Sequence, residues 1–183
     1  MAAVRLFAAL IPPEDVLDEV ERAVAPFSGR VPGLRWPARE TWHVTLGFFG
    51  EVPDRALPEL ETRLARAVSR HKALDVAFEG FGAFSSPRRG RVLWTGMTGD
   101  PAHRLADSVK AGARRAGAAQ TDDKRLHAHL TLARSKAEQD LRPLIEALGP
   151  FASSPWRAAE VHLVRSHLGP PLRYESLASW ALG

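Results

Sequence analysis

The sequence predicts a globular domain of mixed strands and helices that is built as two similar halves. Three observations support this prediction. The chain has 183 residues, of which 45% are hydrophobic and 25% are charged, as in ordinary folded proteins. Strand-like and helical patterns alternate along it. The phrase HVTL at residues 43–46 returns as HLTL at residues 129–132.

Length and composition already exclude several kinds of protein. A chain of 183 residues is large enough for one compact domain with its own core. It contains no cysteine, which excludes disulfides, thiolate metal sites and cysteine nucleophiles. Catalysis in this chain would therefore depend on histidine, serine, threonine or carboxylate side chains.

The formal net charge is +4, and arginine supplies most of the positive charge. Arginine makes planar, two-pronged contacts with phosphate oxygens, although a solvated arginine-rich surface explains the same composition. The apolar run Leu6–Ile11 is shorter than the core of a signal peptide. No stretch reaches the roughly 20 apolar residues that cross a bilayer. We therefore expect a cytoplasmic protein without a membrane partner.

The first half of the chain contains two predicted helices between extended segments. Val4–Ile11 is apolar and ends at a double proline, which is typical of a buried strand. Apolar residues at helical spacing then predict a helix from Pro13 to about Ala25. Trp36 and Thr41–Phe49 are predicted to be extended. A second apolar stripe over residues 57–68 predicts the next helix.

The second half repeats this alternation of strands and helices. Its predicted elements are strands at Leu74–Phe81 and Arg91–Met97, a helix through Leu105 and Ala113, a strand that carries the second histidine phrase, a helix through Leu141 and Leu148, and strands at Glu160–His167 and Arg173–Ser179. Each histidine phrase thus lies on a strand that a helix follows. We expect the two halves to meet near Gly96–Pro101.

The repeated phrase places a histidine and a threonine together on one face of a strand. Residues i and i+2 of a strand point to the same face, about 6.5–7 Å apart. His43 therefore accompanies Thr45, and His129 accompanies Thr131. Strict alternation assigns the opposite, apolar face to Val44, Leu46 and Phe48 in the first copy and to Leu130 and Leu132 in the second.

Two polar strand faces in one small protein predict a shared cleft, because buried polar groups need partners. Histidine titrates near neutral pH, so one imidazole is suited to accept a proton while the other donates one. Threonine hydroxyls donate hydrogen bonds to charged oxygens. Phosphodiester hydrolysis needs this combination, since its attacking and leaving oxygens lie on opposite sides of phosphorus.

On these residues the chain resembles the two-histidine (2H) phosphoesterases, and among them the RNA 2′,3′-cyclic phosphodiesterases, which are also called 2′-5′ RNA ligases. The resemblance extends over essentially the whole chain. The segments that carry it are RLFAALIPPE, HVTLGFFGEV, GFGAFSSPRRGRVLW, HLTLAR and RYESLASWAL.

The resemblance implies an α+β fold in which residues 1–183 form a single domain of two lobes. It implies two antiparallel sheets related by a pseudo-twofold axis, a V-shaped cleft between them, and helices outside. His43 would be the proton donor and His129 the proton acceptor. Thr45, Thr131 and Arg134 would bind the phosphate.

The implied substrate is RNA with a 2′,3′-cyclic phosphate end, either a tRNA-like fragment or an oligonucleotide, and the implied product carries a 2′-phosphate. Reversible 2′-5′ RNA ligation is an additional open activity. No metal and no organic cofactor are implied, and we expect a monomer.

Three positions depart from a simple reading of the pattern. The family often has proline before the second histidine, where this chain has Ala128. His127 is an additional histidine that alternation places beside His129, and we expect it at the rim of the cleft. Alternation also points Arg134 to the apolar face. Because an unpaired charge is costly there, we expect the strand to end, twist or bulge after Leu132.

Other interpretations of the same residues remain open. His127 and His129 with His43 or with Asp122 and Asp123 would make a metal site. The cleft would also serve an RNA-binding module that recognises ends without turnover, or a phosphodiesterase for another cyclic nucleotide or 2′-5′ linkage.

The basic and aromatic residues near the predicted cleft each allow a functional and a structural interpretation. Arg88, Arg89 and Arg91 either follow an RNA backbone or form a solvated turn. Aromatic rings would stack a base at the cleft, but core packing explains most of them equally well. The rings concerned are Trp42, Phe48, Phe84 and Trp94.

Overall fold

The computed structural model describes residues 2–183, whose nine strands all pair antiparallel. The strands are β1 (Ala3–Leu10), β2 (Leu34–Arg35), β3 (Val44–Pro53), β4 (Leu74–Ser86), β5 (Arg89–Gly99), β6 (His129–Gln139), β7 (Trp156–Ala158), β8 (Glu160–His167) and β9 (Arg173–Ala181). The helices are α1 (Glu14–Val24), α2 (Leu57–Val68), α3 (His103–Arg115) and α4 (Arg142–Leu148), with 3-10 turns η1 (Ala25–Phe27), η2 (Arg39–Thr41) and η3 (Asp54–Ala56).

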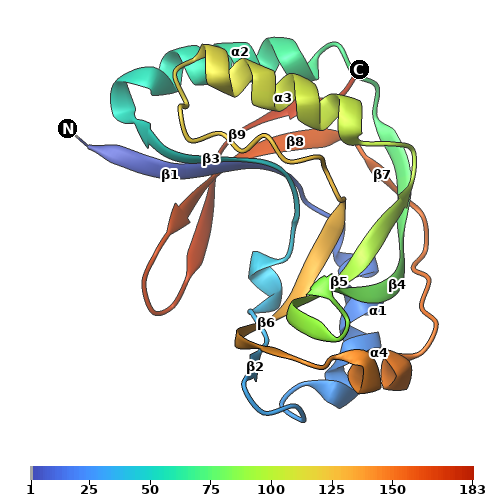
Figure 1. Ribbon diagram of the computed structural model, residues 1–183. Coiled ribbons are helices and arrows are strands. Elements are labelled where there is room, and N and C mark those ends of the chain that lie inside the picture. Colours follow the sequence, from blue (N-terminus) through green and yellow to red (C-terminus); the bar gives the residue numbers. More distant parts are fainter. Residues whose placement is uncertain (1) are drawn as a thin grey trace.

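The strands follow one another in space in the order β7-β4-β5-β6-β3-β1-β8-β9, and β2 pairs with β6. Among the described residues, β6 and β3 are paired only through Leu130 and Val44. The sheet is thus two groups of strands that diverge from this single pair (Figure 1). The antiparallel α+β class is confirmed, while hydrogen bonding makes the expected two sheets continuous at one point.

Helices cover the outside of both groups of strands. Figure 1 shows α2 and α3 packed side by side over the β3-β1-β8-β9 group. The other group carries α1 and α4 at its side, where Glu19 of α1 accepts a hydrogen bond from the backbone N–H of Ser154. Each longer helix turns an apolar stripe inward, as its spacing predicts, and these stripes join the strands in one large core cluster.

Most predicted elements are confirmed within a few residues, and the differences have local causes. β4 and β5 run beyond their predicted ends because only Pro87 and Arg88 separate them in a tight hairpin. β7 was not predicted, since its three residues are too few to show a period. His43 lies immediately before β3, and His129 is the first residue of β6.

Close packing of one aromatic side chain depends on glycine. Gly82 of β4 faces Trp94 of β5, and a Cβ atom at position 82 would lie 2.4 Å from the indole ring. Glycine therefore lets the indole lie flat against the neighbouring backbone. This packing holds the Trp94 ring beside the start of β6, close to the imidazole of His129.

Candidate active site

The single pair that joins β3 to β6 brings the two histidine phrases together. Val44 pairs with Leu130 in antiparallel register, and each of these residues directly follows a histidine. In such a register the preceding residue of one strand opposes the following residue of the other. The result is a crossed quartet in which His43 opposes Thr131 and Thr45 opposes His129.

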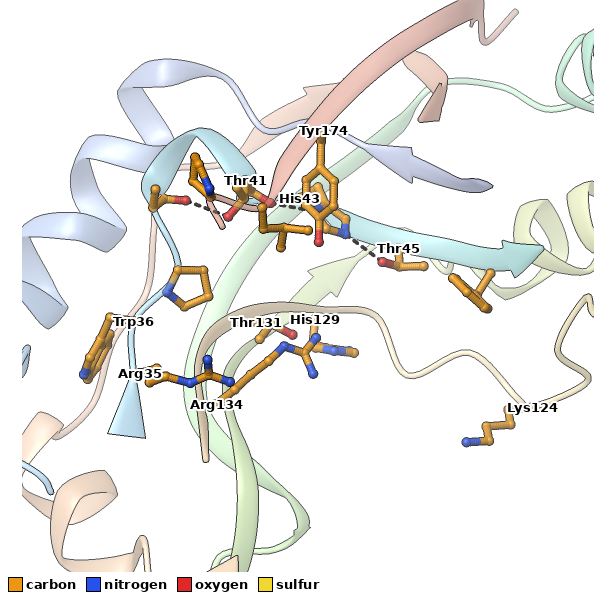
Figure 2. Close-up of a pocket in the computed structure, with 15 residues that line it drawn as sticks. Arg35, Trp36, Thr41, His43, Thr45, Lys124, His129, Thr131, Arg134 and Tyr174 are labelled. Atoms are coloured by element: carbon orange, nitrogen blue, oxygen red, sulfur yellow. Dashed lines mark hydrogen bonds between the residues drawn. The ribbon is translucent and has the colours of Figure 1, made fainter. Parts of the chain in front are cut away.

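All four side chains of the quartet line one cavity of about 780 Å³, together with Arg134. Figure 2 shows them between Trp36 and Arg35 at one end and Lys124 at the other, with Tyr174 above His43. The five residues predicted from the sequence are therefore neighbours in space.

A β-bulge turns Arg134 into this cavity. Leu93 of β5 pairs with Ala133, but the next residue, Trp94, pairs with Thr131, so Leu132 is an extra residue in β6. Leu132 and Ala133 are both fully buried, and Arg134 then returns to the cleft side. The expected departure from alternation after Leu132 is thus confirmed.

The first phrase carries the same bulge, and this overturns the prediction for Phe48. Ala8 of β1 pairs with Gly47 and Ala9 pairs with Thr45, which leaves Leu46 as the extra residue. Phe48 consequently lies on the cleft side with Thr45 and lines the cavity. Strict alternation had placed it on the apolar face, and it fails because a bulge shifts every later residue by one.

The His43 ring is held by hydrogen bonds at both nitrogens. Its Nδ1 lies 2.7 Å from the carbonyl oxygen of Thr41, and its Nε2 lies 2.9 Å from Oγ1 of Thr45. A carbonyl only accepts, so Nδ1 carries the hydrogen and Nε2 faces the cleft. The rings of Phe7 and Tyr174 pack against it at centroid distances of 4.7 and 5.2 Å.

His129 is oriented in the same way. Its Nδ1 donates to the carbonyl oxygen of His127, again two residues earlier in the chain. Phe84 packs edge-on against the imidazole with 4.9 Å between centroids, and Trp94 lies 6.3 Å away. This leaves Nε2 as the nitrogen available to the cleft. His127 lies beside these rings, 6.0 Å from His129.

The pKa values of both histidines are lowered. Burial is the largest cause for each, because it disfavours the charged imidazolium. The hydrogen bond to a backbone carbonyl opposes this effect in each case, and the charge of Arg134 adds to it. Both rings therefore favour the neutral form at neutral pH.

An ion cluster outside the cleft holds the turn before His43. Arg39 of η2 forms salt bridges of 2.5–2.7 Å with three carboxylates of α1, those of Glu14, Asp18 and Glu21. The hydrogen bonds to Asp18 and Glu21 are the main causes that raise its pKa. Sequence analysis missed Arg39, because its three partners lie 18–25 residues away.

A second cluster holds the loop between α3 and β6. Asp122 accepts from the backbone N–H of Phe48 at 2.9 Å, and its own N–H donates to the carbonyl oxygen of Phe48. The buried Lys110 donates to Asp122 Oδ1 and to the carbonyl oxygen of Lys124. The Asp122 carboxylate, which the sequence suggested as a candidate metal ligand, is thus engaged in this hydrogen-bond network.

Residues 2–183 contain no group of three or more histidine, cysteine, aspartate or glutamate side chains arranged to hold a metal ion. Within the same range no helix is long and apolar enough to cross a membrane.

The basic and aromatic residues near the cleft have different surroundings. Arg89 of the basic turn pairs with Glu138 of β6 at 2.7 Å. Trp42 is a core residue, while Phe84 and Trp94 pack beside His129.

Tyr174 is a cleft residue that sequence analysis did not select. It lies on β9, lines the cavity and packs edge-on against Phe7 and His43. Burial raises the pKa of its phenol. The only signal in the sequence was that it is the single tyrosine of the chain.

Several relatives of this chain are named RNA 2′,3′-cyclic phosphodiesterases. The chain is 35% identical over 133 residues to an RNA 2′,3′-cyclic phosphodiesterase from Archaeoglobus fulgidus, covering 72% of this chain and 73% of that protein. It is 32% identical over 177 residues to one from Thermus thermophilus, covering 91% and 83%.

Solved structures share the fold. The chain superposes on TT0787 of Thermus thermophilus with a TM-score of 0.80 and 29% identity over 97% of each chain. It also resembles E. coli LigT complexed with 3′-AMP, with a TM-score of 0.76 and 25% identity over 100% of this chain and 99% of that one. The family model for LigT-like phosphoesterases matches residues 11–94 and 96–173. The chain therefore belongs to the LigT-like phosphoesterase family.

Proposed function

We propose that this protein hydrolyses RNA 2′,3′-cyclic phosphate ends to 2′-phosphate ends, with His43 as proton donor and His129 as proton acceptor. The observation that carries the proposal is the crossed His–Thr quartet around one cavity, with Arg134 turned into it by the Leu132 bulge. The names of the curated relatives support the same substrate.

In the proposed reaction the cyclic phosphate lies within the quartet. The hydroxyls of Thr45 and Thr131 donate to its non-bridging oxygens, and the guanidinium of Arg134 compensates their charge. Nε2 of His129 takes a proton from water as the water oxygen bonds to phosphorus. The P–O3′ bond breaks on the opposite side, and Nε2–H of His43 protonates the departing oxygen.

The protonation of His43 depends on the substrate in this proposal. Burial favours the neutral ring in the free enzyme, whereas an acid must carry a second proton. The anionic cyclic phosphate beside the ring stabilises the imidazolium, so binding favours the form that donates. Protein groups supply both proton transfers and the charge stabilisation, and we propose that the reaction is independent of metal ions.

Product analysis tests the proposal directly. The protein is incubated with a short RNA that ends in a 2′,3′-cyclic phosphate, with and without a chelator, and the ends are identified by phosphatase sensitivity and chromatography. We expect a 2′-phosphate end at the same rate in both samples. A 3′-phosphate end would contradict the assigned roles, and tight binding without turnover would favour an end-binding module. Loss of activity that zinc or manganese restores would favour a metal site.

Further parts of the proposal concern the wider context of the reaction. We propose that residues 1–183 form one domain with two similar lobes, which the two matched segments of the family model support. The protein would act as a monomer in the cytoplasm on tRNA-like fragments or oligonucleotides. Light scattering of the purified protein checks the monomer. An enzyme for another cyclic nucleotide would show a higher kcat/KM on that ester than on RNA ends.

A further inference from the structure

A second hollow of about 470 Å³ adjoins the quartet at His129. It shares four residues of the site with the first cavity, namely Thr45, His129, Thr131 and Arg134. His43 lines only the first cavity. The residues peculiar to the second hollow include Arg125, His127 and Phe84. The reacting phosphorus would thus lie between two spaces, of which one adjoins His43 and both adjoin His129.

The two spaces correspond to the two sides of an in-line reaction. The departing O3′ must lie on the side of His43, which protonates it, while the ribose stays bound to phosphorus through O2′. The attacking oxygen must come from the side of His129. A water molecule takes up only about 30 Å³. The second hollow is many times larger than an attacking water needs, and its volume is comparable with that of a nucleotide site.

The walls of the second hollow suit a nucleotide. Arg125 and Lys124 bring two positive charges to its rim, and Arg134 adds a third from the quartet. Phe84 and His127 line the hollow with 5.1 Å between their ring centroids. Trp94 does not line the hollow, but its ring packs against His127 with 4.7 Å between centroids. Cationic side chains beside aromatic rings are the usual means of holding a nucleotide by its phosphate and base.

The loop that carries these cations is anchored rather than free. Lys110 is 4% exposed, and its ammonium donates to the carbonyl oxygen of Lys124 and to Asp122. Asp122 also accepts from the N–H of Lys124 and from the N–H of Phe48. The Asp122 carboxylate in the hollow is therefore compensated by Lys110, and the basic rim keeps its position relative to β3.

We infer that the second hollow binds the nucleotide on the attacking side of phosphorus, the first residue of an RNA that has a free 5′-hydroxyl and a phosphate at its 3′ position. Arg125, with Lys124, holds that 3′-phosphate. This inference rests on the proposed function. It assigns a binding site and a recognition group to the RNA whose 5′-hydroxyl would attack in place of water. Hydrolysis alone requires no such site.

The chemistry balances without any further reactant. The 5′-hydroxyl gives its proton to Nε2 of His129, the O5′–P bond forms, the P–O3′ bond breaks, and His43 protonates O3′. The product is a 2′-5′ phosphodiester with a free 3′-hydroxyl. The reverse reaction uses the same groups in opposite roles, so a 2′-5′-linked dinucleotide is a stable probe that occupies both spaces at once.

The experiment compares three substrates: 2′,3′-cyclic AMP, the 2′-5′-linked dinucleotide ApA, and the same dinucleotide with a 3′-terminal phosphate, ApAp. Initial rates of cleavage to the cyclic phosphate and the 5′-hydroxyl product give kcat/KM for the dinucleotides. We expect ApAp to exceed ApA by about tenfold or more, as one charge-assisted phosphate contact provides.

The variant Arg125→Ala identifies the contact. We expect it to remove the advantage of ApAp over ApA, while kcat/KM for hydrolysis of 2′,3′-cyclic AMP stays within about twofold of the original protein. Arg104→Ala is the matched control, because Arg104 is an exposed arginine on α3 outside both cavities. This control variant should leave kcat/KM for all three substrates unchanged.

The outcomes separate the inference from the proposed function. Equal rates on ApA and ApAp, no cleavage of either, or an equal loss on all substrates in Arg125→Ala would overturn the second site while hydrolysis of cyclic ends stands. Failure of the original protein to hydrolyse a cyclic phosphate would overturn the proposed function and this inference together.

Discussion

Nδ1 of His43 donates a hydrogen bond to the carbonyl oxygen of Thr41, at 2.7 Å. Thr41 ends the 3-10 turn η2, and Arg39 at the start of that turn is bound to three carboxylates of α1. The backbone N–H of Trp42 donates to the carbonyl oxygen of Arg39, which closes the turn. The orientation of the imidazole in the cleft is therefore linked to an ion cluster outside it.

Replacement of Arg39 should disturb His43 without touching the substrate. We expect Arg39→Ala to lower kcat by about tenfold and to raise the pKa of His43 toward 6.5, because a looser turn lets water reach the ring. Since His43 is the proposed proton donor, this shift should appear on the alkaline limb of the kcat/KM profile. Rates measured from pH 4.5 to 8.5 check both effects. Arg39→Lys should restore part of the activity, since it keeps one ion pair. A fall in folded fraction with an unchanged pH profile would contradict the positioning role.

Removal of either imidazole should nearly abolish turnover. We expect His43→Ala and His129→Ala each to lower hydrolysis of a cyclic phosphate end by about 10²–10⁴, which is the usual contribution of a general acid or base. His162→Ala is the matched control, because His162 bonds to Ser176 on the β8–β9 hairpin and lies outside both cavities. Near-normal rates in either active-site variant would disprove the acid–base assignment.

The pH optimum should lie on the acidic side of the ordinary histidine pKa. The profile of kcat/KM reports the free enzyme, in which one histidine must be protonated and the other neutral. Both pKa values are lowered from 6.5, so the maximum between them falls below 6.5. The maximum of kcat should be at higher pH, because the bound anion raises both values. Steady-state rates across pH at low and saturating substrate test this difference.

Stability should decrease at acidic pH because of the lowered histidine pKa values. His43, His71, His129 and His162 all have lowered pKa values, so each binds fewer protons folded than unfolded at mildly acidic pH. The free energy of unfolding should therefore be constant above about pH 7 and decrease as pH falls below 6.5. Urea titrations at several pH values measure it. His43→Gln and His129→Gln should each flatten the decrease.

The loop anchor should contribute to stability through a nearly buried charge. Asp122→Ala leaves the Lys110 ammonium with only the Lys124 carbonyl, and we expect it to lower the free energy of unfolding by about 1–3 kcal/mol. Asp122→Asn keeps an acceptor for the N–H of Phe48, so its free energy of unfolding should decrease less. Equal stability of Asp122→Ala and the original protein in urea would show that the pair contributes nothing.

The order of elements and the two His–Thr pairs could be predicted from the sequence because local patterns carry this information, whereas Arg134 was expected only from the family resemblance. Apolar spacing set the helices, and the repeated His-x-Thr-Leu marked two strands with one polar face each. The chemistry of Arg134 also required a bulge after Leu132, because an arginine does not remain unpaired on an apolar face.

The way these parts meet depends on contacts between distant segments. The matching bulge at Leu46 arises from pairing between β3 and β1, so alternation along one strand misplaced Phe48. The Arg39 cluster and the Lys110–Asp122 anchor join residues that lie far apart in sequence or on separate elements. The crossed quartet itself follows from one residue pair, Val44 and Leu130. Register between distant strands is set by the whole core, which no local pattern records.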